Sequence, residues 1–180
     1  DARPAVGEGE LLEDRFEANQ DEEVTMYIEG PFRSNYALES LHRTNQNPPT
    51  SFISTEGSAK STSIITVIQT YAESNPDFKR LVERNDQSGS GVPDRNLDEI
   101  YSALFNSPFS DRAAQYLTKD RQSIKIEYAI KSDASQEEIT EDARAFAQDF
   151  RFHAVPTGQI VVFQAVSDLI FASADRKSVV

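Results

Sequence analysis

Hydrophobic and polar residues alternate in four segments of the chain. The clearest alternation lies in SIKIEYAI, where every second residue from Ile124 to Ile130 is apolar or aromatic. EEVTMYIEG repeats it at Val24, Met26 and Ile28. A period of two is typical of a strand with one buried face. With shorter patterns in TSFIST and RFHAVPT, the sequence predicts strands at about 23–29, 50–56, 122–131 and 150–156.

Apolar residues spaced by three and four predict helices between and beyond these strands. The residues that favour helix starts are Ser34 or Asn35, Ser61, Asn75, Asn96, Ser107 and Ser135. Ser135 and Glu138 also have the spacing of a capping box. Two further helices are predicted near the ends, at about 8–19 and 158–175. The segment NDQSGSGVPD is expected to be a flexible linker.

The order of these elements predicts an α+β fold. Without the middle helices it is β-α-β followed by β-α-β, which is typical of a ferredoxin-like split β-α-β sandwich. The expected sheet has four antiparallel strands, with two helices on one face and the first strand between the third and fourth. A helical insertion at about 59–120 separates the second and third strands. This domain, 21–157, would be flanked by a membrane-proximal helix in 1–20 and a helix in 158–180 that leads toward a transmembrane span. Both would leave from one end of the sheet.

The net charge of the chain limits the classes of function that it can have. The 180-residue chain carries a net charge of −12, and its 12 arginines outnumber its six lysines. Nucleic-acid binding needs basic patches, so this balance argues against it. An acidic, lysine-poor surface is typical of a protein adapted to molar salt, as in a halophilic archaeon. The alternative is an ordinary acidic bacterial domain.

Candidate chemistry is sparse. There are no cysteines, and we expect His42 and His153 to be surface histidines rather than metal ligands. The acidic runs DEE and EEITED are expected to be solvated, with Glu137 and Glu138 favouring a helix start. SGSGVPD lacks the lysine of a phosphate loop. The sequence therefore predicts a protein that is not an enzyme and has no catalytic residue, no metal and no cofactor.

Four aromatic residues gather in the predicted insertion. They are Tyr101, Phe105, Phe109 and Tyr116. Aromatic side chains of this kind could line an apolar cleft for a lipid-like or drug-like substrate. The competing interpretation is that they form the hydrophobic core of the insertion. They are the only residues that the sequence offers for substrate binding.

Several segments resemble one family of exporters. VTMYIEG, and VPTGQIVVFQAVSDLI after the last strand, resemble the extracytoplasmic loop of resistance-nodulation-division (RND) exporters of the MMPL branch. LLEDRFEANQDEEVTMYIEG resembles the helix and strand that follow the first membrane span of that family. LDEIYSALFNSPFSDRAAQYLTKDRQSIKIEYAI resembles its helical hairpin and third strand. The family's proton-relay acids lie in membrane spans, so they have no counterpart among these residues.

This resemblance implies a porter-like domain on the extracytoplasmic side of the cell membrane, which binds or passes substrate without catalysis. Its expected partners are the transmembrane spans and a second porter-like domain of the same transporter, with a lipid-like or hydrophobic substrate. The sequence leaves open whether the protein forms a homo-oligomer. The alternative function is a stand-alone ferredoxin-like module for regulation or small-ligand binding.

The charge balance gives a first testable prediction. Screening by salt relieves the repulsion among 30 acidic residues that face only 18 basic ones. We therefore expect the melting temperature to rise steeply as KCl is raised into the molar range, as followed by circular dichroism. A melting temperature that stays flat between low and molar KCl would remove the halophilic interpretation.

Overall fold

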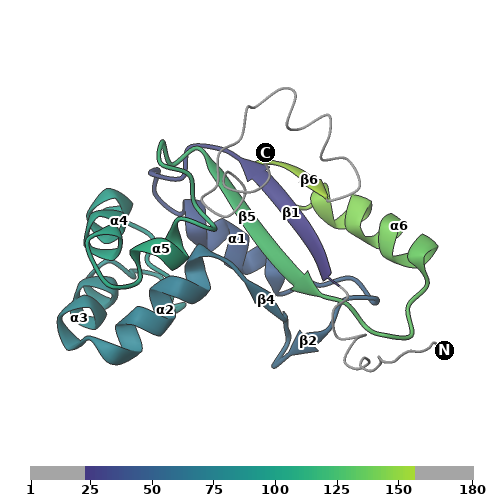
Figure 1. Cartoon of the computed structure of the whole chain (residues 1–180), viewed down its shortest axis with the longest axis horizontal. Coiled ribbons are helices and arrows are strands. Elements are labelled where there is room, and N and C mark those ends of the chain that lie inside the picture. The colour runs from purple at the N-terminus through teal and green to yellow at the C-terminus, as the bar shows by residue number, and fades with distance from the viewer. Residues whose placement is uncertain (1–22, 157–180) are drawn as a thin grey trace.

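The computed structural model describes residues 23–156, which form an α+β fold with a four-stranded antiparallel sheet and six helices (Figure 1). The helices predicted at 8–19 and 158–175 lie outside the described residues. The strands are β1 (Glu23–Glu29), β2 (Ser54–Thr55), β3 (Ser58–Ala59), β4 (Ser61–Thr62), β5 (Ser123–Ala129) and β6 (His153–Pro156). The helices are α1 (Ala37–Asn45), α2 (Ile64–Ser74), α3 (Pro76–Arg84), α4 (Leu97–Phe105), α5 (Ser110–Ala113) and α6 (Gln136–Ala147).

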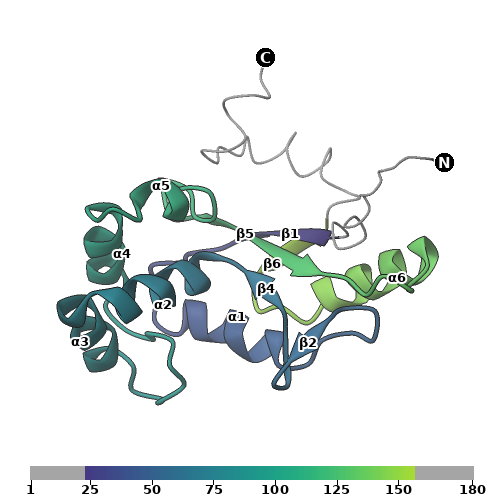
Figure 2. The ribbon, with the colours of Figure 1, turned by 60° about the horizontal axis from the view of Figure 1, so that its bottom comes forward.

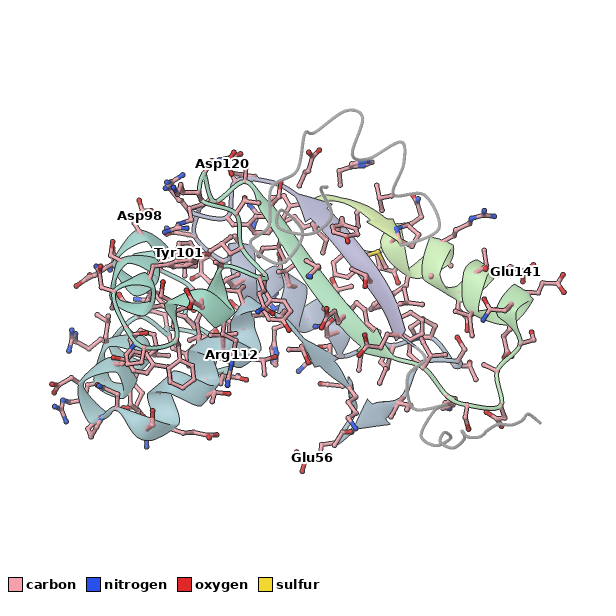
Figure 3. All side chains as sticks on the ribbon, viewed as in Figure 1. Glu56, Asp98, Tyr101, Arg112, Asp120 and Glu141 are labelled. Carbon is pink, nitrogen blue, oxygen red and sulfur yellow. The ribbon has the colours of Figure 1, made fainter. Side chains whose placement is uncertain are left out.

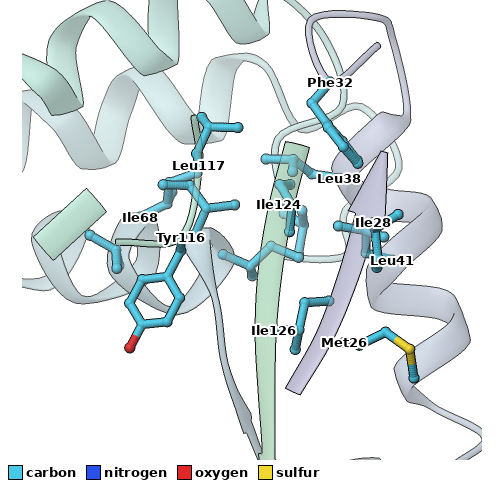
Figure 4. Close-up of a cluster of buried hydrophobic side chains, with 14 of the residues drawn as sticks. Met26, Ile28, Phe32, Leu38, Leu41, Ile68, Tyr116, Leu117, Ile124 and Ile126 are labelled. Carbon is cyan, nitrogen blue, oxygen red and sulfur yellow. The ribbon is translucent and has the colours of Figure 1, made fainter. Parts of the chain in front are cut away.

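The main sheet has the strand order β4-β5-β1-β6, and every neighbouring pair is antiparallel. The predicted alternation of β1 and β5 is confirmed, because Met26 and Ile28 are fully buried and face Ile126 and Ile124 across the ladder. Strand β1 lies between β5 and β6, as the sequence predicts. The buried residues form one apolar face on which the rest of the domain packs (Figure 4).

The predicted edge strand at 50–56 is wrong, so the strand order differs from the expected one at this edge. Phe52 makes a single bridge to Ile130, and the chain then leaves the sheet. Glu56 and Gly57 have positive φ angles of 55° and 86°, which turn residues 54–59 into the β2-β3 hairpin. The chain returns to the edge of the sheet only at Ser61–Thr62. Only Ala59 of this polar hairpin is buried in the core, so the hairpin has no continuous apolar face that would hold it in the sheet.

Helices α1 and α6 cover the same face of the sheet (Figure 2). Tyr128 of β5 shows this directly, because its side chain meets both helices. Its hydroxyl donates to Asn45 Oδ1 of α1 at 2.5 Å, and its ring packs edge-on against Phe146 of α6 at 5.5 Å between centroids. The two-helix layer that the sequence predicts is therefore present.

The predicted helix starts are confirmed at some positions and wrong at others. Asn75 caps α3 through its Oδ1, and Ser135 and Glu138 form the predicted capping box of α6. Helix α1 begins after Tyr36, in a left-handed conformation without a side-chain cap, and not at Ser34 or Asn35. Ser61 belongs to strand β4, and Ser63 caps α2 instead.

The segment predicted as a flexible linker is an ordered loop built around two aspartates. The Asp86 carboxylate accepts hydrogen bonds from the backbone N–H groups of Gly89, Ser90 and Gly91 at 2.8–3.2 Å. Asp94 is fully buried and accepts from two more backbone N–H groups of the loop. The composition of this segment predicted a flexible linker. Aspartates whose carboxylates accept hydrogen bonds from nearby backbone N–H groups hold such a turn in one conformation.

Helices α2–α5 lie at one end of the sheet, beside the end of β1 and the start of β5 (Figure 1). Gly30 N and Phe32 N donate to the carbonyls of Gln122 and Arg121, which ties the chain after β1 to the segment that leads into β5. Glu23 lies at the other end of the sheet, and β6 runs toward that end as far as Pro156, which pairs with Met26 in the middle of β1.

The ordered loop gives a second prediction. Replacing Asp86 with Ala removes the acceptor of three backbone N–H groups, and hydrogen bonds to a charged group contribute about 1.5–3 kcal/mol. We expect Asp86→Ala to lower the free energy of unfolding by about 2 kcal/mol and to open the loop to proteases. Urea unfolding and limited proteolysis measure both effects. The matched control is Asp133→Ala, at an exposed site before α6. Equal stability of the two variants would contradict the role of Asp86.

Candidate functional site

Each of the four aromatic residues predicted to bind substrate packs against other residues of the domain. Tyr101 is 1% exposed, and its hydroxyl donates to the carbonyl of Phe32 at 2.6 Å. Burial raises the pKa of this phenol well above its ordinary value. Phe109 is partly buried and lies 5.2 Å from the ring of Tyr71, between ring centroids. Both residues hold helices of the insertion in place.

Tyr116 and Phe105 have other partners. The Tyr116 hydroxyl donates to Glu127 Oε1 at 3.3 Å, and burial together with this carboxylate raises the Tyr116 pKa to about 12. The guanidinium of Arg121 lies over the Phe105 ring at 4.1 Å. Each predicted residue thus has a structural contact, and Phe105 shares Arg121 with Tyr101. A shared substrate cleft among them stays a prediction.

Near Tyr101, a network of charged side chains joins α4 to the loop that follows β1 and to the loop that precedes β5 (Figure 3). Arg33, which follows β1, donates from Nε to Asp98 of α4 at 2.8 Å and from Nη1 to the carbonyl of Asp120 at 2.8 Å. The Arg121 guanidinium also lies 5.7 Å from the Tyr101 ring centroid. Burial, with the nearby charge of Arg33, lowers the Arg121 pKa below its ordinary value. The contacts fix the position of α4.

The remaining polar candidates are scattered. His42 is half-buried in α1, 3.4 Å from the Gln46 amide nitrogen, and His153 is exposed in β6. Asp142 of the EEITED run accepts from the backbone N–H of Ser51 at 3.1 Å. No group of three or more His, Asp or Glu side chains within residues 23–156 could hold a metal ion.

The structure reveals a groove that the sequence did not predict. It has a volume of about 340 Å³ and lies between α1 and the segment that joins α6 to β6. We call it the α1 groove. Its lining residues are Tyr36, Glu39, Ser40, Arg43, Thr44, Asp149 and Arg151.

Glu39 is the most unusual residue of the α1 groove. It is 3% exposed, and its Oε2 accepts from Arg43 Nη2 at 3.0 Å, one helical turn later. Its Oε1 is buried without a hydrogen-bond partner. A buried carboxylate oxygen normally has partners, because leaving such a group unsatisfied costs about 1–3 kcal/mol or more. Arg43, by contrast, has a side chain that is 70% exposed.

Tyr36 lines the groove and is 37% exposed. Its positive φ of 64° is uncommon for a bulky residue. Contacts with the insertion hold it there: its backbone N–H donates to the carbonyl of Asp94 at 2.9 Å, and Arg95 Nη2 donates to its hydroxyl at 3.4 Å. Burial lowers the Arg95 pKa, but the stronger effect of the Tyr36 hydrogen bond raises it overall.

The α1 groove combines charges of both signs. Glu39 and Asp149 supply two carboxylates, while Arg43 and Arg151 supply two guanidinium groups. The lining can therefore pair with ligand groups of either charge. One signal in the sequence could have revealed it: Glu39 falls among the apolar positions Ala37, Leu38 and Leu41, on the buried side of the helix.

Comparison of the chain with protein families, with curated proteins and with solved structures gives no significant match. Within residues 23–156, none of the helices is long and apolar enough to cross a membrane.

Tyr101 gives a third prediction, which separates its structural contact from a role in binding. Tyr101→Phe keeps the buried ring and removes the hydrogen bond to Phe32, so we expect a loss of about 1–2 kcal/mol in the free energy of unfolding. Urea unfolding measures it. Tyr71→Phe is the matched control, because that ring stacks on Phe78 and Phe109 in either form and should cost little. A stability of Tyr101→Phe equal to that of the control would show that the buried contact contributes nothing.

Proposed function

We propose that this domain is the extracytoplasmic, porter-like part of a membrane export pump of the RND/MMPL type. It contributes substrate binding or passage and contacts with other domains of the pump, and it performs no catalysis. The proposal joins the resemblance of the quoted segments to the arrangement of the chain ends in the fold.

The observation that carries the proposal is where the chain enters and leaves the sheet. It enters at Glu23 on β1 and leaves at Pro156 on β6, which are neighbouring antiparallel strands paired from Met26↔Pro156 to Glu29↔His153. Strand β6 runs from the end of β1 back toward its start, and Pro156 lies opposite Met26 in the middle of β1, so at Pro156 the chain is heading for the end of the sheet at which β1 begins. A loop between two membrane spans needs this geometry, since both of its ends return to one bilayer surface.

The fold we propose for this role is a variant of the ferredoxin-like split β-α-β sandwich. Two features support it: β1 lies between β5 and β6, and α1 and α6 cover one face. The short strand β4 would take the place of the full second strand, with Phe52 keeping one bridge to the sheet. Helices α2–α5 would then be an insertion at the end far from the membrane.

A cysteine-accessibility experiment on the full-length protein in its host cells tests the location. The 180 residues contain no cysteine, so a single introduced thiol reports on this domain. We expect Lys79→Cys, at an exposed position on α3, to react with a membrane-impermeant maleimide in intact cells. The control is Ser51→Cys, a nearly isosteric change at a 1% exposed site, which should react only after denaturation.

The labelling outcome decides between the two functions considered. Reaction of Lys79→Cys only after cell lysis, with the protein in the soluble fraction, would contradict the export-pump proposal and favour the stand-alone module. Export itself is checked by deleting the gene and measuring the cellular retention of a hydrophobic dye. We expect retention to rise and to return to normal with the intact gene, and unchanged retention would count against export of such compounds.

A further inference from the structure

We propose that the α1 groove binds a small zwitterion of the α-amino acid class, with its ammonium group on Glu39 and its carboxylate on the arginines. This inference goes beyond the proposed function and does not depend on it, because it rests only on residues that line the groove. An export domain and a stand-alone module could both carry such a site.

The unsatisfied oxygen of Glu39 is the first argument. Oε2 is paired with Arg43, whereas Oε1 is buried with no donor. An ammonium group brings three N–H donors and a positive charge, and hydrogen bonds between ionised partners are about twice as strong as neutral ones. A ligand ammonium would complete the hydrogen bonding of this carboxylate.

The arginines supply the complementary half of the site. Arg43 is the exposed partner of the Glu39 ion pair, and Arg151 is exposed with its guanidinium 4.7 Å from the Phe152 ring centroid. A guanidinium binds a carboxylate through paired N–H donors. Oε1 is buried in the absence of a ligand, so the ligand ammonium reaches it when Arg43, whose side chain is 70% exposed, turns outward from the Glu39 carboxylate. Arg43 then donates to the ligand carboxylate, and Glu39 accepts from the ligand ammonium.

The charges and the size of the groove favour a zwitterion over a simple ion. A plain cation would meet Arg43 and Arg151, and a plain anion would meet Glu39 and Asp149, so each would face two like charges. A molecule with both charges satisfies the two pairs. The volume of about 340 Å³ lies at the lower end of the range for small-molecule sites, about 300–1,000 Å³. Tyr36, which lines the groove with the Arg95 guanidinium 5.9 Å from its ring centroid, offers apolar surface for the ligand side chain.

The test uses the complete 180-residue chain and amide NMR spectra. Pools of the common L-amino acids are added to about 10 mM, a concentration that detects even millimolar binding. We expect at least one amino acid to shift the amide signals of α1 and of residues 149–151. Its N-acetyl derivative and its methyl ester, each of which lacks one charge, should bind at least about tenfold more weakly, which corresponds to about 1.4 kcal/mol.

Variants assign the two halves of the site. Glu39→Gln and Arg151→Gln should each weaken binding about tenfold or more, while the matched changes Glu83→Gln and Arg84→Gln on the exposed surface of α3 should leave it unchanged. The dispersion of the amide spectrum shows whether Glu39→Gln stays folded. Should it unfold, Arg151→Gln still decides the matter, because that side chain is exposed.

Three results would overturn the proposal. The first is the absence of shifts with every amino acid, and the second is shifts confined to other parts of the domain. The third is equal binding of either singly charged derivative, or of Glu39→Gln or Arg151→Gln, because one charge would then suffice.

Discussion

The described fold depends on one buried tyrosine, Tyr128, at the centre of the sheet. Its side chain is fully buried, and its hydroxyl donates to Asn45 Oδ1 at the end of α1. Its ring lies 5.3 Å from Phe52 and 5.5 Å from Phe146, which also contact each other. One residue of β5 therefore joins α1, α6 and the chain segment that approaches the sheet edge. Such a buried phenol needs its acceptor, and burial raises its pKa well above the ordinary value.

The packing around Tyr128 also explains which elements the sequence could predict and which it could not. The period of two through Tyr128 predicted β5 and its buried face, and the same pattern predicted β1, because each strand pairs over its whole length. The edge was not predictable in this way. Phe52 is apolar because it packs on Tyr128, not because it belongs to a strand, and the polar pair Ser61–Thr62 carries no alternation. The α1 groove was missed because Glu39 Oε1 is exceptional only once the helix is packed.

Helices α2–α5 are attached to the sheet through strained backbone as well as through apolar contact. Tyr36, Asn96 and Arg121 all have φ angles between 51° and 64°, a region that costs a non-glycine residue about 1–2 kcal/mol. Each is held by specific bonds: Asn96 Nδ2 donates to Asn85 Oδ1 at 2.6 Å, and Tyr36 N donates to the carbonyl of Asp94. Strain of this kind persists only where the surroundings fix it. The residues before α1, before α4 and before β5 therefore set the position of the insertion together.

Tyr36 connects the α1 groove to the loop between α3 and α4. Asp94 and Arg95 of that loop hold the backbone and the hydroxyl of Tyr36, and the side chain of Tyr36 lines the groove. Asp94 is in turn fixed by the ordered turn that Asp86 organises. A change in that turn would therefore reach the groove through Asp94 and Tyr36 without passing through the sheet. The first turn of α1, which carries Glu39, is itself packed in the core through Ala37 and Leu38, so Tyr36 is the residue that connects the turn of Asp86 to the groove.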